Sequence, residues 1–133
     1  MKTLGFIGTG GMGSGMAANL IKAGYRLVVN DLNRAQAKGL EDQGAEFADS
    51  PKAVAESCDL VLSMLPNNDA VKAVGLRKGG LAEATSGAKV WIDFSSIDKA
   101  TIVGVSKELK QTGWTIVDAG AGGAEEVAAA GNL

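Results

Sequence analysis

The sequence predicts an α/β fold in which a doubly wound parallel sheet lies between two layers of helices, in an α/β/α arrangement. Short apolar runs alternate along the chain with segments of helical periodicity, as in a series of β-α units. Most of the apolar runs are continuous rather than alternating, which is typical of parallel strands buried on both faces. Short loops and right-handed crossovers then favour the strand order 3-2-1-4-5-6.

The apolar runs define six predicted strands, of which the third is the weakest. They cover residues 3–8, 26–31, 45–47, 59–65, 89–94 and 114–119. The first helix is expected to begin at Gly11 or Met12, and Gly24 can close it. Later helices are marked by capping side chains, namely Asn33, Ser50 before Pro51, Asn67 or Asn68, and Asp98. The helix after Asn33 is expected to run to about Gln43.

Length and composition restrict the classes of function. The chain has 133 residues, 46% of them apolar, which suits one domain with its own core. The net charge of −2 without a basic cluster argues against nucleic acid and anionic membrane as partners. No apolar run reaches the roughly 20 residues of a membrane span, and no signal peptide is predicted, so a cytoplasmic protein is expected. The absence of histidine excludes His-containing triads and metal sites within this chain, and no metal site is predicted.

A glycine-rich stretch, FIGTGGMGSGMAANL at residues 6–20, carries the strongest functional signal. Gly8, Gly10 and Gly13 spell G-x-G-x-x-G between the first predicted strand and the first helix. The first glycine makes a tight turn, the second lets a pyrophosphate approach the backbone, and the third lets helix and strand pack closely. The sequence therefore predicts a Rossmann-type dinucleotide-binding domain, with a tight turn that binds no ligand as the alternative.

Two further features complete the predicted cofactor site. Thr9, Gly11 and Met12 belong to the same loop and first helical turn, where free N–H groups and a partial positive charge suit a diphosphate. Asp31 ends the second strand 18 residues after Gly13, where a carboxylate accepts from ribose hydroxyls. A solvated acid at a strand end is the alternative for Asp31. Because Leu32 rather than arginine follows it, NAD is predicted over NADP, with Arg34 as the residue able to reverse this preference.

Several motifs together resemble the 3-hydroxyisobutyrate dehydrogenase group of β-hydroxyacid dehydrogenases, relatives of 6-phosphogluconate dehydrogenase. The resemblance begins with FIGTGGMGSGMAANLIKAGY, including Met12, Met16 and Asn19-Leu20. It continues in the same order with SMLPNNDAV (63–71), DFSSID (93–98) and DAGAGGAEEVAAAGNL (118–133).

The resemblance implies roles for later residues. Leu65 and Pro66 should line the cofactor cleft, and Ser96 should lie near the nicotinamide ribose. A stiff strand exit is the alternative for Leu65-Pro66, and a helix-initiating turn for Ser95-Ser96. The family loop D-A-P-V-S-G-G is replaced here by Asp118 to Ala124, with Gly122 at the serine position. The N–H groups of Gly122 and Gly123 could still bind a substrate anion, and a hinge is the alternative.

Two departures from the family remain. The family usually has leucine where Thr9 stands, and the replacement is expected to be harmless in an exposed turn. Family members also carry a second, all-helical domain with an essential lysine, which would lie beyond Leu133. The expected division is therefore a dinucleotide-binding domain over 1–118, with a substrate loop and the start of an interdomain connection over 119–133. No catalytic residue is expected within this chain.

The function predicted from these features is the cofactor-binding part of an NAD-dependent oxidoreductase acting on a small β-hydroxy acid or semialdehyde. A homo-oligomer is expected for the full-length enzyme. A regulatory NAD(H)-sensing module is a first alternative, against which the substrate loop at 118–133 argues. An S-adenosylmethionine methyltransferase is a second, and that class lacks the dense Met12-Gly13, Met16 and Asn19 pattern.

Overall fold

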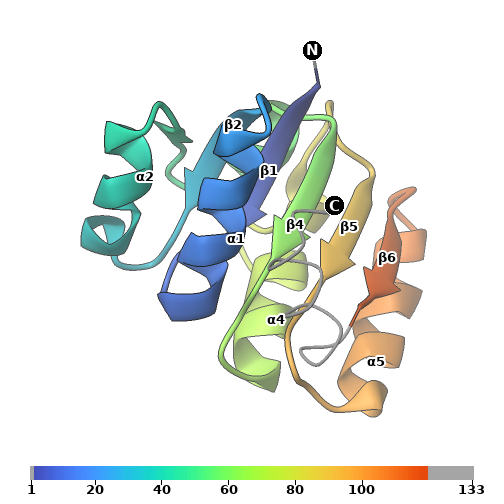
Figure 1. Ribbon diagram of the computed structural model, residues 1–133. Helices are drawn as coiled ribbons and strands as arrows, with labels where there is room; N and C mark the ends of the chain where they lie inside the picture. Colours follow the sequence, from blue (N-terminus) through green and yellow to red (C-terminus); the bar gives the residue numbers. More distant parts are fainter. Residues whose placement is uncertain (1, 120–133) are drawn as a thin grey trace.

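A computed structural model describes residues 2–119 of the chain. Its six parallel strands form one sheet in the order β3-β2-β1-β4-β5-β6, which confirms the predicted α/β class and strand order (Figure 1). The strands are β1 (Thr3–Ile7), β2 (Arg26–Asn30), β3 (Glu46–Phe47), β4 (Leu60–Ser63), β5 (Val90–Asp93) and β6 (Thr115–Asp118). The helices are α1 (Gly11–Lys22), η1 (Arg34–Ala37), α2 (Lys38–Asp42), α3 (Pro51–Glu56), α4 (Asn68–Leu76), η2 (Leu81–Glu83) and α5 (Lys99–Lys110).

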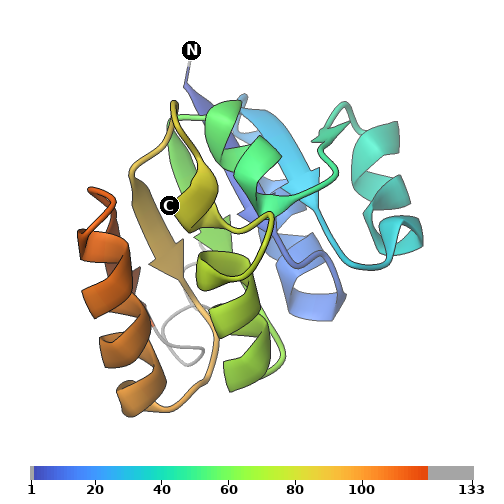
Figure 2. The ribbon, with the colours of Figure 1, turned by 180° about the vertical axis from the view of Figure 1, so that it is seen from behind.

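Helices lie on both faces of the sheet. Helices α1 and α2 cover one face, and α3, α4 and α5 cover the other, as the view from behind shows (Figure 2). Each face has its own apolar cluster because alternate strand residues point to opposite sides. Phe6 and Leu62 pack with Met16 and Leu20 of α1, whereas Ile7 and Val61 pack on the opposite side. The three layers of the predicted architecture are therefore present.

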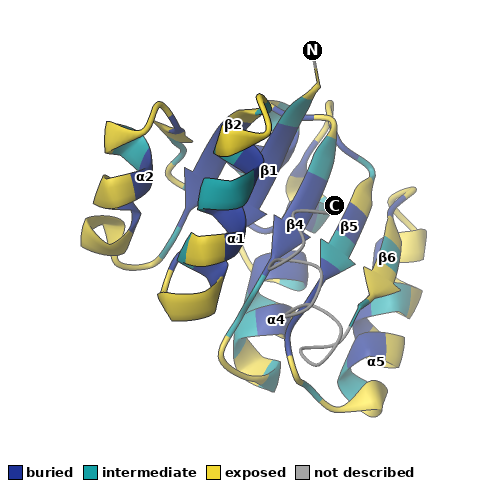
Figure 3. Ribbon diagram, viewed as in Figure 1, coloured by how far each residue is buried: buried dark blue, intermediate teal, exposed yellow. Residues whose placement is uncertain are grey.

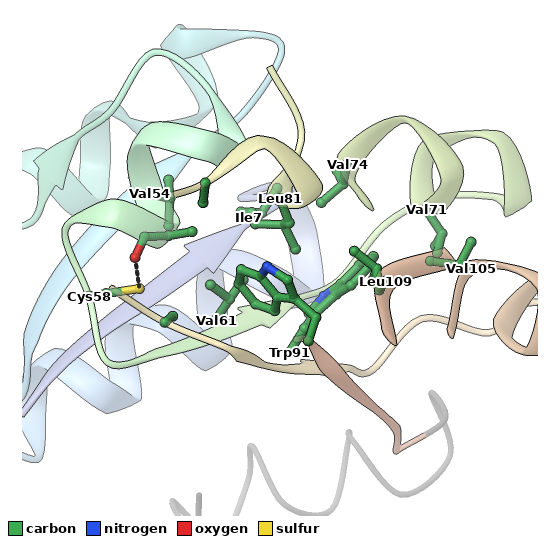
Figure 4. Packing of buried hydrophobic residues seen from close by; sticks show 14 of the residues in the cluster. Ile7, Val54, Cys58, Val61, Val71, Val74, Leu81, Trp91, Val105 and Leu109 are labelled. Carbon is green, nitrogen blue, oxygen red and sulfur yellow. Dashed lines mark hydrogen bonds between the residues drawn. The ribbon is translucent and has the colours of Figure 1, made fainter. Parts of the chain in front are cut away.

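Burial is deepest in the middle of the sheet and falls toward β6. Strand β1 pairs with both β2 and β4 and is almost wholly buried, whereas three of the four residues of β6 are exposed (Figure 3). Trp91 on β5 is fully buried and packs between sheet and helices with Val61, Val105 and Leu109 (Figure 4). The glycine motif that follows β1 therefore begins at the end of a deeply buried central strand.

The predicted helix starts are confirmed at four positions. Side-chain oxygens of Asn33, Ser50 and Asn67 accept from the backbone N–H of Ala35, Ala53 and Ala70, so each satisfies a donor that a helix start leaves free. Asp98 also precedes its helix but makes no side-chain cap. Its carboxylate accepts instead from the Asn68 amide at 2.9 Å, which ties the starts of α4 and α5 together.

The helix predicted from Asn33 to about Gln43 is only partly correct. The segment begins as the 3₁₀ helix η1 and becomes α-helical only over α2, a stretch of five residues. Asn33 caps at Ala35, two residues on, which favours a tight first turn. Gly44 lies beyond the end with a φ of 111°, as a helix-terminating glycine should. The short helix η2 was not predicted from the sequence.

Candidate functional site

The carboxyl ends of β1, β2 and β4 open onto a groove of about 680 Å³. The chain passes from β1 to β2 on one side and returns to β4 on the other, so the strand order reverses at this point. Ligands of doubly wound sheets bind in the crevice at such a switch point, and this volume is typical of small-molecule sites. Six predicted cofactor residues line the groove: Gly10, Met12, Gly13, Asp31, Leu65 and Pro66.

The glycine loop folds as the spacing predicts, and two of its glycines are required by the protein itself. Gly8 has a φ of 93°, and a Cβ there would overlap the carbonyl oxygen of Met64. Gly13 is buried in the first turn of α1, and a Cβ there would overlap the carbonyl oxygen of Gly8. Gly11, in contrast, has open space around its Cα. The first and third glycines therefore allow the helix to sit directly against the turn.

The second glycine leaves the helix start accessible. Gly10 occupies the N-cap position of α1, is exposed, and offers no side chain to cap the helix. The first intrahelical acceptor is its carbonyl, which accepts from the Ser14 N–H at 2.9 Å. The preceding N–H groups of the first turn belong to the groove wall formed by Gly10, Met12 and Gly13. They can bind an anionic diphosphate where the helix dipole also favours negative charge.

Asp31 lines the groove, and its carboxylate already has three donors within the protein. Oδ2 accepts from the Thr9 N–H at 2.7 Å and from the Thr9 hydroxyl at 3.1 Å, and Oδ1 accepts from the Asn33 N–H at 2.8 Å. A carboxylate has about four acceptor positions, so one remains for a ribose hydroxyl. The orientation of the carboxylate is therefore set before any ligand arrives.

The expectation that Thr9 occupies an exposed turn is wrong. Thr9 is buried, with 1% of its surface exposed, and does not line the groove. Its position is buried because the turn folds back toward the end of β2, where the Gly8 N–H donates to the Asn30 carbonyl. A hydroxyl at such a position needs an acceptor, and Asp31 provides it.

Three cationic side chains near the groove differ in their partners. Arg34 lies 3.2 Å from Glu41 and 4.6 Å above the Phe47 ring, so its guanidinium is held toward α2 and β3. Arg77 makes a two-pronged contact with Asp69, and this contact lowers the pKa of the Asp69 carboxyl. Lys78 follows Arg77 along the same groove wall. Arg34, the residue able to reverse the predicted NAD preference, is thus directed toward Glu41 and Phe47.

The part of the groove wall formed by the loop after β4 and by α4 is mainly apolar. Leu65 and Pro66 follow β4, and Ala70, Ala73 and Val74 come from α4. These α4 side chains are small, and the fully exposed Leu32 after β2 lines the same groove. Such walls can bury a planar apolar ring, as an adenine requires. The pattern of small residues on α4 was the sequence signal for this wall, and it was not recognised.

A buried polar network lies behind the loop after β4. The Ser63 and Ser95 hydroxyls donate to Asp93 Oδ1 at 2.6 and 2.7 Å, and Ser63 accepts from the Trp91 indole at 2.7 Å. The Ser95 hydroxyl oxygen in turn accepts from the Leu65 N–H at 2.6 Å. The network therefore fixes the backbone from which Leu65 and Pro66 enter the groove.

Asp93 is the one fully buried carboxyl of this network. Burial raises its pKa, while the hydrogen bonds from Ser63 and Ser95 oppose the rise. Asp118, opposite Asp93 in the β5–β6 register, adds to the rise through its charge. Asp93 Oδ2 has no hydrogen-bond partner among residues 2–119. The carboxyl is accordingly more stable as the neutral acid than an exposed aspartate is.

The remaining predicted residues fall into two groups. Ser96 is exposed and does not line the groove, whereas its neighbour Ser95, which was considered only as part of a turn, supports the groove from behind. Gly122 and Gly123, and with them the predicted segment 119–133 beyond Ala119, lie outside the described residues. The roles of Ser96, Gly122 and Gly123 therefore stay predictions.

A metal site, a membrane-spanning helix and a nucleophilic cysteine find no support in the described part of the chain. Within residues 2–119 no three metal-ligating side chains gather, and no helix there has the length and apolar character needed to cross a bilayer. Burial raises the pKa of the Cys58 thiol to about 11, so this side chain is packed as an apolar group rather than poised as a nucleophile.

Fold and groove together define a dinucleotide-binding Rossmann domain. Over residues 3–133 the chain belongs to the family described as the NAD binding domain of 6-phosphogluconate dehydrogenase. NAD is accordingly the cofactor of this domain, in agreement with the prediction.

Similar proteins agree with this assignment. Over the whole chain the sequence is 39% identical to a 3-hydroxyisobutyrate dehydrogenase of Pseudomonas aeruginosa, and the match spans 45% of that protein. It is 35% identical over 98% of the chain to the chloroplastic glyoxylate/succinic semialdehyde reductase 2 of Arabidopsis thaliana, of which 37% is covered. A solved Mycobacterium tuberculosis 3-hydroxyisobutyrate dehydrogenase with L-serine superposes with a TM-score of 0.82 and 35% identity, covering 98% of this chain and 44% of that one. The chain thus spans less than half the length of these relatives.

The contact between Gly13 and Gly8 predicts a matched pair of variants. Gly13→Ala should lower the free energy of unfolding by about 3 kcal/mol, because the added methyl overlaps the backbone of a buried turn. Gly11→Ala, two residues away in the same helix with open space around it, should change it by less than about 0.5 kcal/mol. Urea unfolding of both variants checks this, and equal effects would contradict the close packing.

The buried Asp93 predicts a pH dependence of stability. A carboxyl with a raised pKa stabilises the folded state fully below its unfolded pKa, and this contribution is lost as the pH rises through the folded pKa. The stability of Asp93→Asn relative to wild type should therefore increase as the pH rises from about 4 toward 8. Denaturant unfolding across this range, with the exposed Asp49→Asn as control, measures it. A relative stability that is flat or falls with pH would contradict the prediction.

Proposed function

We propose that this chain is the cofactor-binding part of an NAD-dependent dehydrogenase that acts on a small β-hydroxy acid or the matching semialdehyde. The observation that carries the proposal is the groove at the switch point, where an uncapped helix start faces an oriented carboxylate across a glycine turn. Family membership supports the same role. Relatives named for 3-hydroxyisobutyrate and for succinic semialdehyde support the substrate class rather than one compound.

The residues present fit a dinucleotide in named roles. The first turn of α1 would hold the pyrophosphate through backbone N–H groups. Asp31 would accept from a hydroxyl of the adenosine ribose, and the apolar wall around Leu65 and Pro66 would cover the adenine side of the groove. When bound, NAD supplies the hydride-transfer chemistry. Ser96 toward the nicotinamide ribose, and Gly122 and Gly123 toward the substrate carboxylate, complete the proposed site.

A preference for NAD over NADP follows from the charges at the adenosine end. A 2′-phosphate would meet the Asp31 carboxylate, and two like charges about 4 Å apart repel by roughly 4 kcal/mol at an effective dielectric near 20. One third of this energy corresponds to about tenfold in affinity. The Arg34 guanidinium is directed to Glu41 and Phe47 and that of Arg77 to Asp69, so each would have to leave its partner to reach the phosphate, which supports the preference.

The other classes considered have less support. A regulatory NAD(H)-sensing module would share the groove but not the resemblance to the dehydrogenase substrate loop. A methyltransferase is not favoured by the family to which the chain belongs. A cytoplasmic location and a homo-oligomeric full-length enzyme are part of the proposal without further observations to support them.

The binding part of the proposal is tested by calorimetric titration of the chain with NAD, NADP and S-adenosylmethionine. NAD should bind most tightly, and Gly10→Val should lose at least about tenfold in NAD affinity because the side chain stands where the diphosphate approaches. The variant should keep its melting temperature, since among residues 2–119, apart from its neighbours in the chain, the new Cβ meets only the flexible end of the Gln36 side chain within 4 Å. Tighter binding of S-adenosylmethionine than of NAD would refute the proposal.

The catalytic part predicts that the 133-residue chain binds NAD without turning over. Oxidation of a hydroxy acid needs a group within about 3 Å of the hydroxyl proton, or one water away. The predicted loop from Gly120 to Ala124 has no titratable side chain, and the family lysine is expected beyond Leu133. NADH absorbance should stay flat with 3-hydroxyisobutyrate or glycerate. Steady turnover at ordinary enzymatic rates would place the base inside this chain.

A further inference from the structure

We infer that Thr9 is a specificity-determining residue, which acts by fixing the Asp31 carboxylate in the orientation that admits NAD and rejects NADP. The inference rests on the proposed dinucleotide site and goes beyond it, because Thr9 itself does not line the groove. It is argued from the hydrogen bonds that join the loop after β1 to the end of β2 at the rim of the groove.

The two carboxylate oxygens of Asp31 accept hydrogen bonds from two different segments, one before and one after it in the chain. Thr9 donates its N–H and its hydroxyl to Oδ2, and the Asn33 N–H donates to Oδ1. One set of donors comes from the glycine loop and the other from the turn after β2. With both oxygens engaged, the carboxylate can neither rotate about its own axis nor swing out of the groove without breaking hydrogen bonds.

The Thr9 hydroxyl is the element of this arrangement that a side-chain replacement can remove. The two backbone N–H donors persist whatever side chain stands at position 9, whereas the hydroxyl donor belongs to Thr9 alone. Thr9 is 1% exposed, so a hydroxyl that lost Asp31 would have no water to replace it. Moving the carboxylate therefore costs a charge-assisted hydrogen bond and leaves a buried donor unsatisfied.

This cost falls only on NADP. NAD presents a ribose hydroxyl, which donates to the carboxylate where it already stands. NADP presents a phosphate at the same position, which requires the carboxylate to move away. Within residues 2–119 the Arg34 guanidinium is directed to Glu41 and to the Phe47 ring, so it would have to leave both to offset the movement at this rim. Thr9 thus strengthens the discrimination against NADP that the Asp31 carboxylate provides.

The test compares one replacement that removes the hydroxyl with one that keeps it. Thr9→Val removes the hydroxyl and keeps the shape of the buried side chain, and Thr9→Ser keeps the hydroxyl. Dissociation constants for NAD and NADP are measured by calorimetry on the 133-residue chain, and their ratio is the readout. Thr9→Val should lower the preference for NAD about three- to tenfold, whereas Thr9→Ser should stay within about twofold of wild type.

A second background separates positioning from a general effect on the fold. In Asp31→Ser there is no carboxylate to hold, so adding Thr9→Val should leave the NAD-to-NADP ratio unchanged. Melting temperatures of all variants establish that binding is compared between folded chains. If Thr9 had only a structural role, Thr9→Val would weaken the binding of NAD and NADP equally and leave the ratio of their dissociation constants unchanged.

The outcomes distinguish this inference from the proposed function. If wild type prefers NAD and Thr9→Val keeps the same ratio, the role of Thr9 is wrong and the proposed function stands. If Thr9→Val shifts the ratio equally in the Asp31→Ser background, the effect does not pass through Asp31 and the inference is also wrong. A wild-type chain that binds neither dinucleotide, or prefers NADP, overturns both the NAD preference and the inference.

Discussion

The packing of α1 against the loop that follows β1 is the contact on which the rest of the site depends. Gly13 lies on the Gly8 carbonyl, and Gly8 lies on the Met64 carbonyl, so neither position has room for a side chain. Through these two glycines the first helix, the central strand and the loop after β4 meet at one point. This meeting brings the uncapped start of α1 to the switch point of the sheet, where a diphosphate can use it.

Two carboxylates at strand ends show how differently one residue type is used. Asp31 is half-buried at the rim and is held by three donors, with capacity left for a ligand. Asp93 is fully buried, shares one oxygen between two serine hydroxyls, and has its pKa raised by burial. The first carboxylate is suited to recognition by its charge. The second joins β4 and β5 and carries the Leu65 backbone through Ser95.

The sequence was sufficient for the fold class, the strand order and the glycine-loop side of the groove, because those features depend on local patterns. Continuous apolar runs, N-cap residues and glycine spacing each act within a few positions. The inward position of Thr9 and the supporting role of Ser95 were missed because both depend on partners far along the chain, Asp31 and Leu65. The division of the segment after Asn33 into η1 and α2 was missed because its cap closes a tighter turn than an α-helix has.

The central place of β1 also governs when the site can form during folding. The groove needs the loop after β1 beside the loop after β4, and the contacts that join these strands link residues 56 positions apart, such as the Thr3 N–H that donates to the Asp59 carboxylate. Parallel strands cannot pair through a hairpin, so this contact must wait for closure of a long crossover. Chains dominated by such distant pairings fold slowly. A growing chain that has passed the whole glycine motif therefore has no dinucleotide site until β4 has been synthesised and has docked beside β1.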